Sequence, residues 1–471
     1  MSPKKSSPRT RSAGFDVVVI GGGSAGLSAA YAAREQGASV AMIADGVLGG
    51  ECPNYACVPT KAMLAAAGRF DDMRRNALAF GIHATKLRFD LATMMERKDA
   101  VVRAMTGHRR IEKILEKEGV TLLRGTAQFV DEESVKVGTH MVSAKAFVIA
   151  TGSVPKIPPI ANIENIDYWT PRDVTSMEQM PESVAIIGSG PVGCEFATFF
   201  SMVGIPVVMF DVADRLMPRE DAEASALAQK ALMARGLVFH GKTKVLAVRQ
   251  ERGGVRLTYQ TGSKPRATLR VERVIIASGR APNVEMLNLE ASGVKRGAHG
   301  EILFDLTMRA KGTRCFFAGD VTSWIPFTHT AHAEGLVAGE NAARLAARSR
   351  TMKSVDLSVV PYVIFVSPEL ASIGKSAETL AAEGAQFSIW RFPVGALGRA
   401  VIERERSGVL KVCVDKKTDQ ILGATMVGER AGEVMHELAL AMYAKIPFST
   451  VQSMIHAYPT MSEAIPGLIP S

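Results

Sequence analysis

Two stretches of the chain share one order of apolar and glycine positions. Residues 15–20 form a short apolar run, which Gly-Gly-Gly-Ser-Ala-Gly at 21–26 and a helical pattern follow. Residues 184–187 form a second apolar run, followed by Gly-Ser-Gly-Pro-Val-Gly at 188–193 and an apolar return at 207–210. A strand, a glycine turn and a helix in this order are typical of a dinucleotide-binding unit, although either run alone could be a simple turn. The sequence therefore predicts two such units.

Each glycine of these turns has its own task. The first allows the tight turn, the second lets backbone N–H groups approach a pyrophosphate, and the third allows close packing of helix on strand. The residues expected at the first site are Gly21, Gly23, Ser24 and Gly26, and those at the second site are Gly188, Gly190 and Gly193.

The residue that ends the second strand of each unit predicts how the ribose is bound. In the first unit this position holds Ala44, and Asp45 one place later is the candidate. In the second unit Asp211 occupies the expected position, where its charge would accept the ribose 2′-OH and repel a 2′-phosphate. This favours NADH over NADPH, a preference that the nearby Arg215 could soften.

Five cysteines suggest redox chemistry at one place. Cys52 and Cys57 are separated by four residues, so a helix from Cys52 onward would bring them to adjacent turns and make a disulfide reasonable. Structural zinc would require two further ligands, and an inert buried pair is the bland alternative. Cys194, Cys315 and Cys413 lie in apolar runs, and we expect them to be small core residues.

Length and composition agree with a multidomain α/β protein. The chain has 471 residues, too many for one core, with 47% apolar residues, 42 glycines and only 6% aromatic residues. Neither an apolar span of about 20 residues nor a secretory signal is recognisable. We therefore expect a cytoplasmic protein that uses neither a membrane nor a disulfide framework.

The positive charge is concentrated at the N-terminus. Without Lys4, Lys5, Arg9 and Arg11, the formal net charge of +9 falls to +5. A start rich in Ser, Pro, Lys and Arg is typical of a disordered tail, predicted here for residues 1–13. No nucleic-acid partner is expected, because short basic ends are usually only solvated.

The segment at residues 49–61 resembles the redox-active motif of the class I pyridine nucleotide-disulfide oxidoreductases, the flavoprotein disulfide reductases. This family includes dihydrolipoamide dehydrogenase, glutathione reductase and mercuric reductase. Similar ordered matches occur across nearly the whole chain, at residues 148–153, 188–195, 278–283, 316–320 and 360–374.

The resemblance implies FAD at the first glycine unit and a nicotinamide cofactor at the second. It implies that Cys57 faces the flavin as a charge-transfer thiolate and that Cys52 attacks the substrate. Lys61 and Glu195 match an ion pair beside the flavin, where a lysine would stabilise negative charge. Asp320 matches the acid that holds the ribityl chain. The other implied cofactor-binding residues are Gly50, Thr151, Gly152, Gly279, Arg280 and Gly319.

The chain departs from the family's pattern near its C-terminal end. Most members carry a His directly before a Pro, whereas here Tyr458 precedes Pro459, with Glu463 retained and His456 two residues upstream. Tyrosine is the weaker base near neutral pH, because its reference pKa is about 10 against about 6.5 for histidine. Mercuric reductase is similar in carrying Tyr there, but residues 467–471 lack its vicinal cysteine pair.

These features predict an NAD(P)H-dependent reductase of a small acceptor, either a disulfide or a thiol-bound metal ion. The alternatives are a dihydrolipoamide dehydrogenase that uses His456 and, more distantly, a non-catalytic flavoprotein sensor. The expected fold is α/β, with two doubly wound dinucleotide-binding domains and an α+β dimerisation domain. The expected boundaries are 14–153 for FAD, 154–280 for NAD, 281–349 for a central segment and 350–471 for dimerisation. We expect a homodimer, because the partner subunit would supply Tyr458 and Glu463.

Overall fold

The computed structural model describes residues 13–107, 109–405 and 407–471. The basic tail predicted for residues 1–13 therefore lies outside the described residues, apart from Ala13. The chain divides into two compact units. One combines the residues up to Pro59 with Asp99–Val154 and Arg280–Leu357, and the other combines Thr60–Lys98, Pro155–Gly279 and Ser358–Ser471. Each predicted dinucleotide unit belongs to a different one of them.

The first unit is built on a mixed sheet with the order β3-β2-β1-β6-β5-β4, in which β16 also pairs with β6. Strands β3, β2, β1, β6 and β16 are parallel, and β5 and β4 are antiparallel. The strands span β1 (Ala13–Ile20), β2 (Val40–Ala44), β3 (Val120–Arg124), β4 (Ala127–Asp131), β5 (Ser134–Val137), β6 (His140–Ile149) and β16 (Cys315–Phe317). The strand order reverses at β1, between β2 and β6, as a doubly wound sheet requires.

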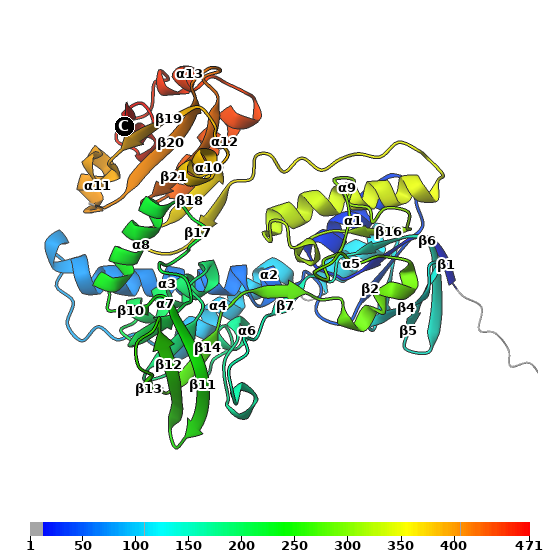
Figure 1. Ribbon diagram of the computed structural model, residues 1–471, viewed down its shortest axis with the longest axis horizontal. Helices are drawn as coiled ribbons and strands as arrows, with labels where there is room; N and C mark the ends of the chain where they lie inside the picture. Colours follow the sequence, from blue (N-terminus) through cyan, green and yellow to red (C-terminus); the bar gives the residue numbers. More distant parts are fainter. Residues whose placement is uncertain (1–12, 108, 406) are drawn as a thin grey trace, which may run out of the picture. The chain divides into compact units, whose positions relative to one another are not determined.

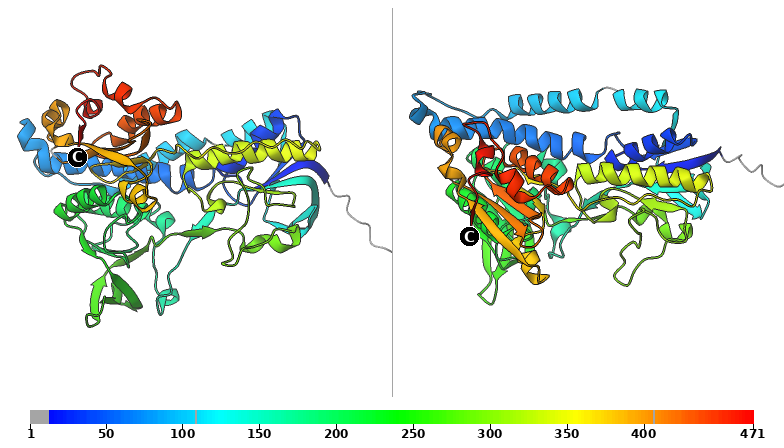
Figure 2. Two further views of the ribbon diagram at one scale, coloured as in Figure 1. Left: turned by 45° about the horizontal axis from the view of Figure 1, so that its top comes forward. Right: turned by 90° about the horizontal axis from the view of Figure 1, so that it is seen from above.

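Helices α1 (Ser24–Glu35) and α9 (Thr328–Ala346) run side by side in the first unit (Figures 1 and 2). Alternation along β1 explains this arrangement, because successive side chains of a strand point to opposite faces. Val17 and Val19 pack with α1 and α9, whereas Val18 and Ile20 pack into a second cluster with Phe129 and residues 284–294. Both faces of the sheet are therefore buried. The unit also contains α2 (Glu51–Asn54) and α5 (Arg110–Lys117).

The second unit contains the second dinucleotide fold, a parallel sheet with the order β10-β9-β8-β14. Its order reverses at β8 in the same way as in the first unit. The strands span β8 (Val184–Ile187), β9 (Val207–Phe210), β10 (Val238–His240) and β14 (Arg273–Ile276), with helices α7 (Pro191–Met202) and α8 (Ala222–Ala234). An antiparallel sheet of β11 (Thr243–Glu251), β12 (Gly254–Thr261) and β13 (Ala267–Val271) accompanies it.

The C-terminal part of the second unit is an antiparallel sheet with the order β17-β18-β21-β20-β19-β22. Helix α12 (Ala431–Tyr443) packs against β18 and β21 (Figure 2). The other members are β17 (Tyr362–Ile364), β18 (Leu370–Gly374), β19 (Phe387–Phe392), β20 (Val409–Asp415), β21 (Ile421–Val427), β22 (Ile469–Pro470), α10 (Ala377–Ala382), α11 (Gly398–Glu403) and α13 (Phe448–Gln452). The predicted fold class is confirmed.

Several shorter or linking elements complete the chain. They are α3 (Cys57–Asn76), α4 (Leu91–Thr106), α6 (Pro171–Val174), and the β7 (Ser153–Pro155) and β15 (Arg280–Pro282) pair. The 3₁₀ turns are Ala77–Phe80, Ile163–Asn165, Glu285–Leu287, Leu289–Ser292, Asp320–Thr322, Val394–Ala396 and Met461–Ala464. Among the described helices, none combines the length and apolar character that crossing a bilayer requires.

Candidate functional site

The first glycine turn has the geometry that a bound pyrophosphate requires. Gly21 has φ +116°, and a Cβ at Gly26 would lie 1.9 Å from the carbonyl oxygen of Gly21. Helix α1 begins at Ser24 directly after this turn, so its first N–H groups and its dipole are available to a phosphate. Gly50 approaches the same turn, since a Cβ there would lie 2.7 Å from the Cα of Gly23.

A hydrogen-bonded chain links the cysteine-bearing segment to Asp320 within the first unit. Arg280 donates to Glu51, one residue before Cys52, with Nη2 2.7 Å from Oε2. The same guanidinium donates to the carbonyl and hydroxyl oxygens of Ser153, at 2.7 and 2.6 Å. The Ser153 hydroxyl in turn donates to Asp320 Oδ2 at 2.8 Å. Glu51 and Ser153 were not predicted as site residues, because only the fold reveals their connection to Arg280.

The residues of the first unit fit a flavin dinucleotide. The hydroxyl oxygen of Thr151 is buried and has no hydrogen-bond partner within the described part of the chain. It therefore offers a polar atom at the end of the β6 strand, where open α/β sheets bind ligands. Gly152 and Gly319 have φ +72° and +81°, in the left-handed region that favours glycine. Asp45 lies exposed directly after β2.

The two predicted redox cysteines lie on two separate helices, one short and one long, and not on one continuous helix. Cys52 lies in α2, and Cys57 begins α3. A continuous helix would place Pro59 in its interior, where proline lacks the N–H and its ring clashes with the carbonyl of the residue four positions earlier. The restart at Cys57 puts Pro59 in a first turn, which tolerates proline. The continuous helix considered from the spacing is therefore not formed, and the two cysteines lie on successive helices.

Cys57 has a hydroxyl neighbour that the sequence did not reveal. Its Sγ lies 3.6 Å from Oγ1 of Thr328, the first residue of α9. Both cysteines are half-buried. A hydroxyl at this distance can donate a weak hydrogen bond to a thiolate, which favours the ionised sulfur.

The predicted ion pair between Lys61 and Glu195 is present in the second unit. Lys61 Nζ lies 2.8 and 2.7 Å from the two carboxylate oxygens of Glu195, which is 6% exposed. The backbone N–H of Phe365 donates to the same carboxylate at 3.1 Å, and the ring of Phe365 lies 4.8 Å from Lys61 Nζ. Three hydrogen bonds thus compensate for burial of the carboxylate.

The second glycine turn repeats the geometry of the first. Gly188 has φ +112°, and a Cβ at Gly193 would lie 2.1 Å from the Gly188 carbonyl oxygen. A Cβ on Gly190 would meet no atom within 4 Å, so this glycine leaves space beside the start of α7. Gly279, three residues after the end of β14, has φ +114°. The predicted nicotinamide site is therefore built like the first site.

Asp211 holds the second turn through its own carboxylate. Oδ2 accepts hydrogen bonds from the backbone N–H and the hydroxyl of Ser189, at 2.6 and 2.8 Å. Oδ1 accepts from the backbone N–H of Ala213 at 2.8 Å. Arg215, the residue considered for a 2′-phosphate, donates to the carbonyl oxygens of Pro218 and Glu220, both at 3.1 Å. Its Nη2 is therefore occupied within the loop, whereas its buried Nε has no hydrogen-bond partner among the described residues.

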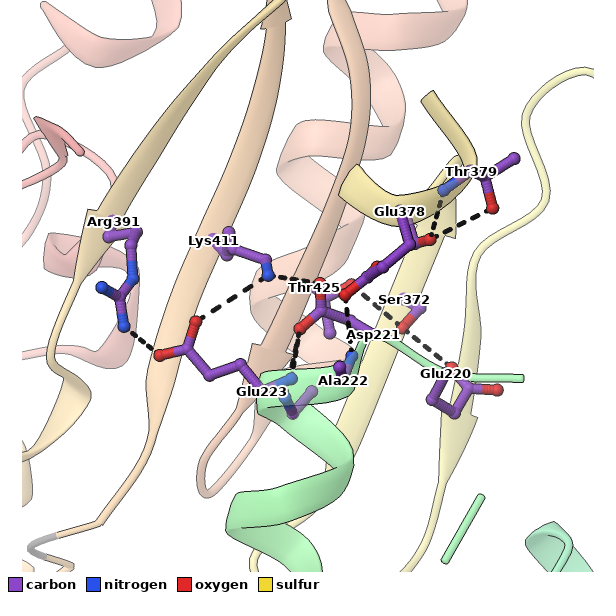
Figure 3. A network of polar contacts seen from close by, with 12 residues as sticks. Glu220, Asp221, Ala222, Glu223, Ser372, Glu378, Thr379, Arg391, Lys411 and Thr425 are labelled. Carbon is purple, nitrogen blue, oxygen red and sulfur yellow. Dashed lines mark hydrogen bonds and ion pairs between the residues drawn. The ribbon is translucent and has the colours of Figure 1, made fainter. Parts of the chain in front are cut away.

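The loop that follows Asp211 is attached to the C-terminal sheet (Figure 3). The buried ammonium of Lys411, on β20, forms an ion pair with Asp221, which caps α8. Glu223, in the first turn of α8, lies 3.8 Å from the same ammonium and also pairs with Arg391 of β19. The C-terminal sheet thereby fixes the start of α8.

The same loop makes a second contact with the C-terminal sheet, to which the sheet contributes only uncharged hydroxyl groups. The carboxylate of Glu220 accepts from the hydroxyls of Tyr362 and Ser372, at 2.8 and 3.3 Å. Burial raises the pKa of Glu220, while the two hydroxyl hydrogen bonds act in the opposite direction. Both hydroxyl contacts, like the ion pair of Lys411, join elements that the sequence analysis assigned to two different domains, the NAD domain and the dimerisation domain.

Tyr458 and His456 lie in different environments. Tyr458 is 77% exposed. The Nε2 of His456 lies 2.8 Å from Glu437 Oε1 of α12, and its Nδ1 lies 3.0 Å from the carbonyl oxygen of Met454. Glu463 caps the turn at 461–464, because its Oε2 accepts the Thr460 N–H at 3.1 Å. The structure thus does not bring these three side chains into one group of hydrogen bonds among the described residues.

The three other cysteines are core residues, as the sequence predicted. Cys194 and Cys315 are fully buried, and Cys413 nearly so. Burial raises the thiol pKa of Cys194 strongly, and that of Cys315 and Cys413 to about 11. These thiols are therefore poor nucleophiles. In the described residues, no group of three or more His, Cys, Asp and Glu side chains is arranged to hold a metal ion.

Comparison with known proteins agrees with this geometry. Residues 15–335 match the pyridine nucleotide-disulphide oxidoreductases, and residues 360–469 match the dimerisation domain of that family, which supports a homodimer. Mercuric reductase of Staphylococcus aureus is 32% identical, over 97% of this chain and 82% of its own length. Mitochondrial dihydrolipoyl dehydrogenase of Pisum sativum is also 32% identical, over 96% and 90%.

A solved structure shows the same fold throughout. The Cu(II) complex of the HOCl-induced flavoprotein disulfide reductase RclA from Escherichia coli superposes with a TM-score of 0.84 at 26% identity, covering 96% of this chain and 98% of that one. Together with two glycine turns, the Lys61–Glu195 pair and the cysteine segment, these matches identify the chain. It belongs to the pyridine nucleotide-disulphide oxidoreductases and is an FAD-dependent disulfide-reductase-type enzyme that uses NAD(P)H.

Proposed function

We propose that this enzyme passes electrons from NADH, through FAD and the pair Cys52 and Cys57, to a thiol-bound metal ion, with a small disulfide as the second acceptor class. Bound FAD supplies the two-electron link between the nicotinamide and the cysteines. Cys57 is the sulfur on the flavin side, and the Thr328 hydroxyl 3.6 Å away supports its thiolate. Cys52 is the interchange thiol that binds or attacks the acceptor.

The predicted cofactor residues keep their assignments in this proposal. FAD is assigned to Gly21, Gly23, Ser24, Gly26, Asp45, Gly50, Thr151, Gly152, Arg280, Gly319 and Asp320. The nicotinamide dinucleotide is assigned to Gly188, Gly190, Gly193, Asp211 and Gly279. Lys61, held by Glu195 at 2.7 Å, is assigned to the flavin, where its charge would stabilise the reduced ring. The domain boundaries proposed from the sequence are likewise retained.

One observation carries the choice of acceptor. Tyr458 occupies the position at which the acid/base histidine is expected. Both ring nitrogens of His456 face oxygen acceptors of their own subunit. Reduction of a disulfide breaks its S–S bond and leaves a thiolate that must gain a proton in the site, whereas reduction of a thiol-bound metal ion sends the two electrons to the metal, and the thiolate ligands that it releases can take protons from solvent. A phenol that keeps its proton near neutral pH suits the second reaction better.

The dimer completes the site in this proposal. Tyr458 and Ile455, three residues earlier in the C-terminal part, are 77% and 99% exposed. A second subunit covering this surface would bring Tyr458 and Glu463 to the cysteines of its partner. A cytoplasmic location is also proposed, because a reducing compartment supplies NADH, with which the cysteine pair is reduced again in each catalytic cycle.

An acceptor panel tests the proposal on the purified holoenzyme. NADH oxidation is measured with Hg(II) presented as a thiol complex, Cu(II), lipoamide and glutathione disulfide. We expect turnover with the thiol-bound metal and slow turnover with lipoamide. Tyr458→His should raise lipoamide turnover, by up to about 10²-fold, while the rate of flavin reduction by NADH stays unchanged.

Two further variants separate this proposal from a dihydrolipoamide dehydrogenase. Tyr458→Phe should slow the metal reaction, because it removes the hydroxyl alone. Strong native lipoamide turnover that survives Tyr458→Phe but collapses in His456→Ala would show that His456 is the base and that the proposed acceptor is wrong. Cys52→Ser serves as the control that should abolish turnover with every acceptor.

A further inference from the structure

A buried glutamate lies beside the loop assigned to the flavin. Glu334, in α9, is 1% exposed, and its Oε2 accepts the backbone N–H of Gly319 at 2.7 Å. The hydroxyl of Thr322 is a second, longer contact of the same oxygen, at 3.4 Å. The other oxygen, Oε1, is buried and has no hydrogen-bond partner in the part of the chain that the structure describes.

The burial of Glu334 follows from close packing of three segments of the first unit. A Cβ at Gly335 would lie 2.3 Å from the carbonyl oxygen of Ala25, so α9 contacts the backbone of α1 directly. A Cβ at Gly319, whose φ is +81°, would lie 2.9 Å from the Cβ of Ala25. The glycine turn at the start of α1, the Gly319 loop and α9 therefore meet at one point, with Glu334 between them.

A carboxyl group at this depth to which the described residues offer no ion pair requires an explanation. Burial, with a smaller contribution from Asp320, raises the pKa of Glu334 to about 7. An apolar side chain would avoid this desolvation, but it would leave the Gly319 N–H without an acceptor. The buried glutamate thus has one structural task, which is to hold the peptide that leads into Asp320.

Asp320 is consequently held from two sides. Ser153 Oγ donates to its Oδ2 at 2.8 Å, and Glu334 fixes the preceding peptide through Gly319. We propose that Glu334 is a positioning residue for the flavin: it orients the Gly319–Asp320 turn so that the Asp320 carboxylate faces the ribityl chain. This inference rests on the assignment of Asp320 in the proposed function.

The dissociation rate of FAD from the purified holoenzyme tests this role. Flavin fluorescence rises on release, so the rate is followed after dilution, with FAD content per subunit measured beforehand. Glu334→Gln keeps a carbonyl acceptor at the same reach, and we expect a rate within about threefold of the native one. Glu334→Met fills similar volume without an acceptor, and the loss of a buried hydrogen bond should accelerate release about tenfold or more.

Matched variants make the outcome decisive. Glu340→Gln and Glu340→Met change a glutamate of the same helix that pairs with Arg344 and Lys353, and they should leave FAD release unchanged. If Glu334→Met does not yield folded protein, Glu334→Asn, whose acceptor is one methylene too short, replaces it with the same expectation.

The possible failures are distinguishable. Asp320→Asn with unchanged FAD release would overturn the assignment of Asp320 and therefore the proposed site. Accelerated release in Asp320→Asn together with native rates in Glu334→Met would refute only the positioning role. If both Glu334 variants have a lower melting temperature but release FAD at the native rate, Glu334 has only a structural role. This result would also refute the positioning role.

Discussion

Replacing Asp211 should change cofactor preference mainly by weakening the use of NADH. The carboxylate accepts three hydrogen bonds, two from Ser189 and one from Ala213, so it fixes the glycine turn as well as offering charge to a ribose. Asp211→Ala removes the charge and the anchor together. The kcat/KM for NADH should therefore fall, while that for NADPH should change little, because relief of repulsion offsets the loss of the anchor.

The magnitude follows from Coulomb's law. A 2′-phosphate carries about −1.5 to −2 charges, and a carboxylate about 5 Å from it, in partly solvated surroundings, repels it by roughly 1.5–3 kcal/mol. That corresponds to a preference for NADH of about 10- to 100-fold. Two backbone N–H groups without acceptors should raise KM for either cofactor by about tenfold. The ratio of the two kcat/KM values should thus narrow at least tenfold.

Initial rates with NADH and NADPH on the same acceptor measure this ratio. Asp214→Ala is the matched control, because Asp214 lies in the same loop with its side chain 61% exposed and makes only a long ion pair with Lys242, at 3.9 Å, among the described residues. Its removal should leave the ratio within about twofold at physiological salt. A native enzyme that prefers NADPH, or an unchanged ratio in Asp211→Ala, would refute the reasoning.

Three further predictions concern the cysteines and the ion pair. Anaerobic NADH addition should produce a long-wavelength absorbance band that Cys57→Ser loses and Cys52→Ser retains; a band persisting in Cys57→Ser would reverse their roles. Lys61→Met leaves the Glu195 carboxylate buried with one backbone donor, so it should destabilise the protein by about 2–3 kcal/mol in denaturant titration and slow flavin reduction. Lys61→Met/Glu195→Leu should recover most of the stability and none of the rate. Iodoacetamide should label the NADH-reduced native protein at the redox pair and not at Cys194, as peptide mass spectrometry would show.

The parts of the fold that the sequence predicted depend on local sterics. The tight turns at Gly21 and Gly188 follow from positions that only glycine can occupy, because a Cβ would lie 2.1 and 2.3 Å from the carbonyl oxygens of Ala150 and Ala277. The apolar runs before them have the length of buried parallel strands. Each of these patterns lies within about 15 residues of sequence, so it can be recognised without knowledge of the fold.

The parts that the sequence missed depend on contacts between distant residues. Arg280 and Glu51 are 229 positions apart, and Lys411 and Asp221 are joined only by the packing of β20 on the start of α8. Glu334 lies in a helix whose one other acid, Glu340, pairs with Arg344 and Lys353, so by sequence pattern the two glutamates look alike. No periodicity distinguishes a buried carboxyl that accepts a backbone N–H from one that faces water.

The choice between Tyr458 and His456 shows why geometry adds to a motif. By position alone, a histidine two residues from the expected place is a plausible substitute. In the structure both of its ring nitrogens are occupied by Glu437 and Met454 of the same subunit, so catalysis by His456 would require those contacts to break first. Tyr458 needs no such rearrangement, since it is 77% exposed on the C-terminal part that matches the dimerisation domain. The hydroxyl of Tyr458 can donate one hydrogen bond and so orient a bound acceptor without itself accepting a proton. This is the physical basis for proposing a thiol-bound metal ion, rather than a disulfide, as the electron acceptor.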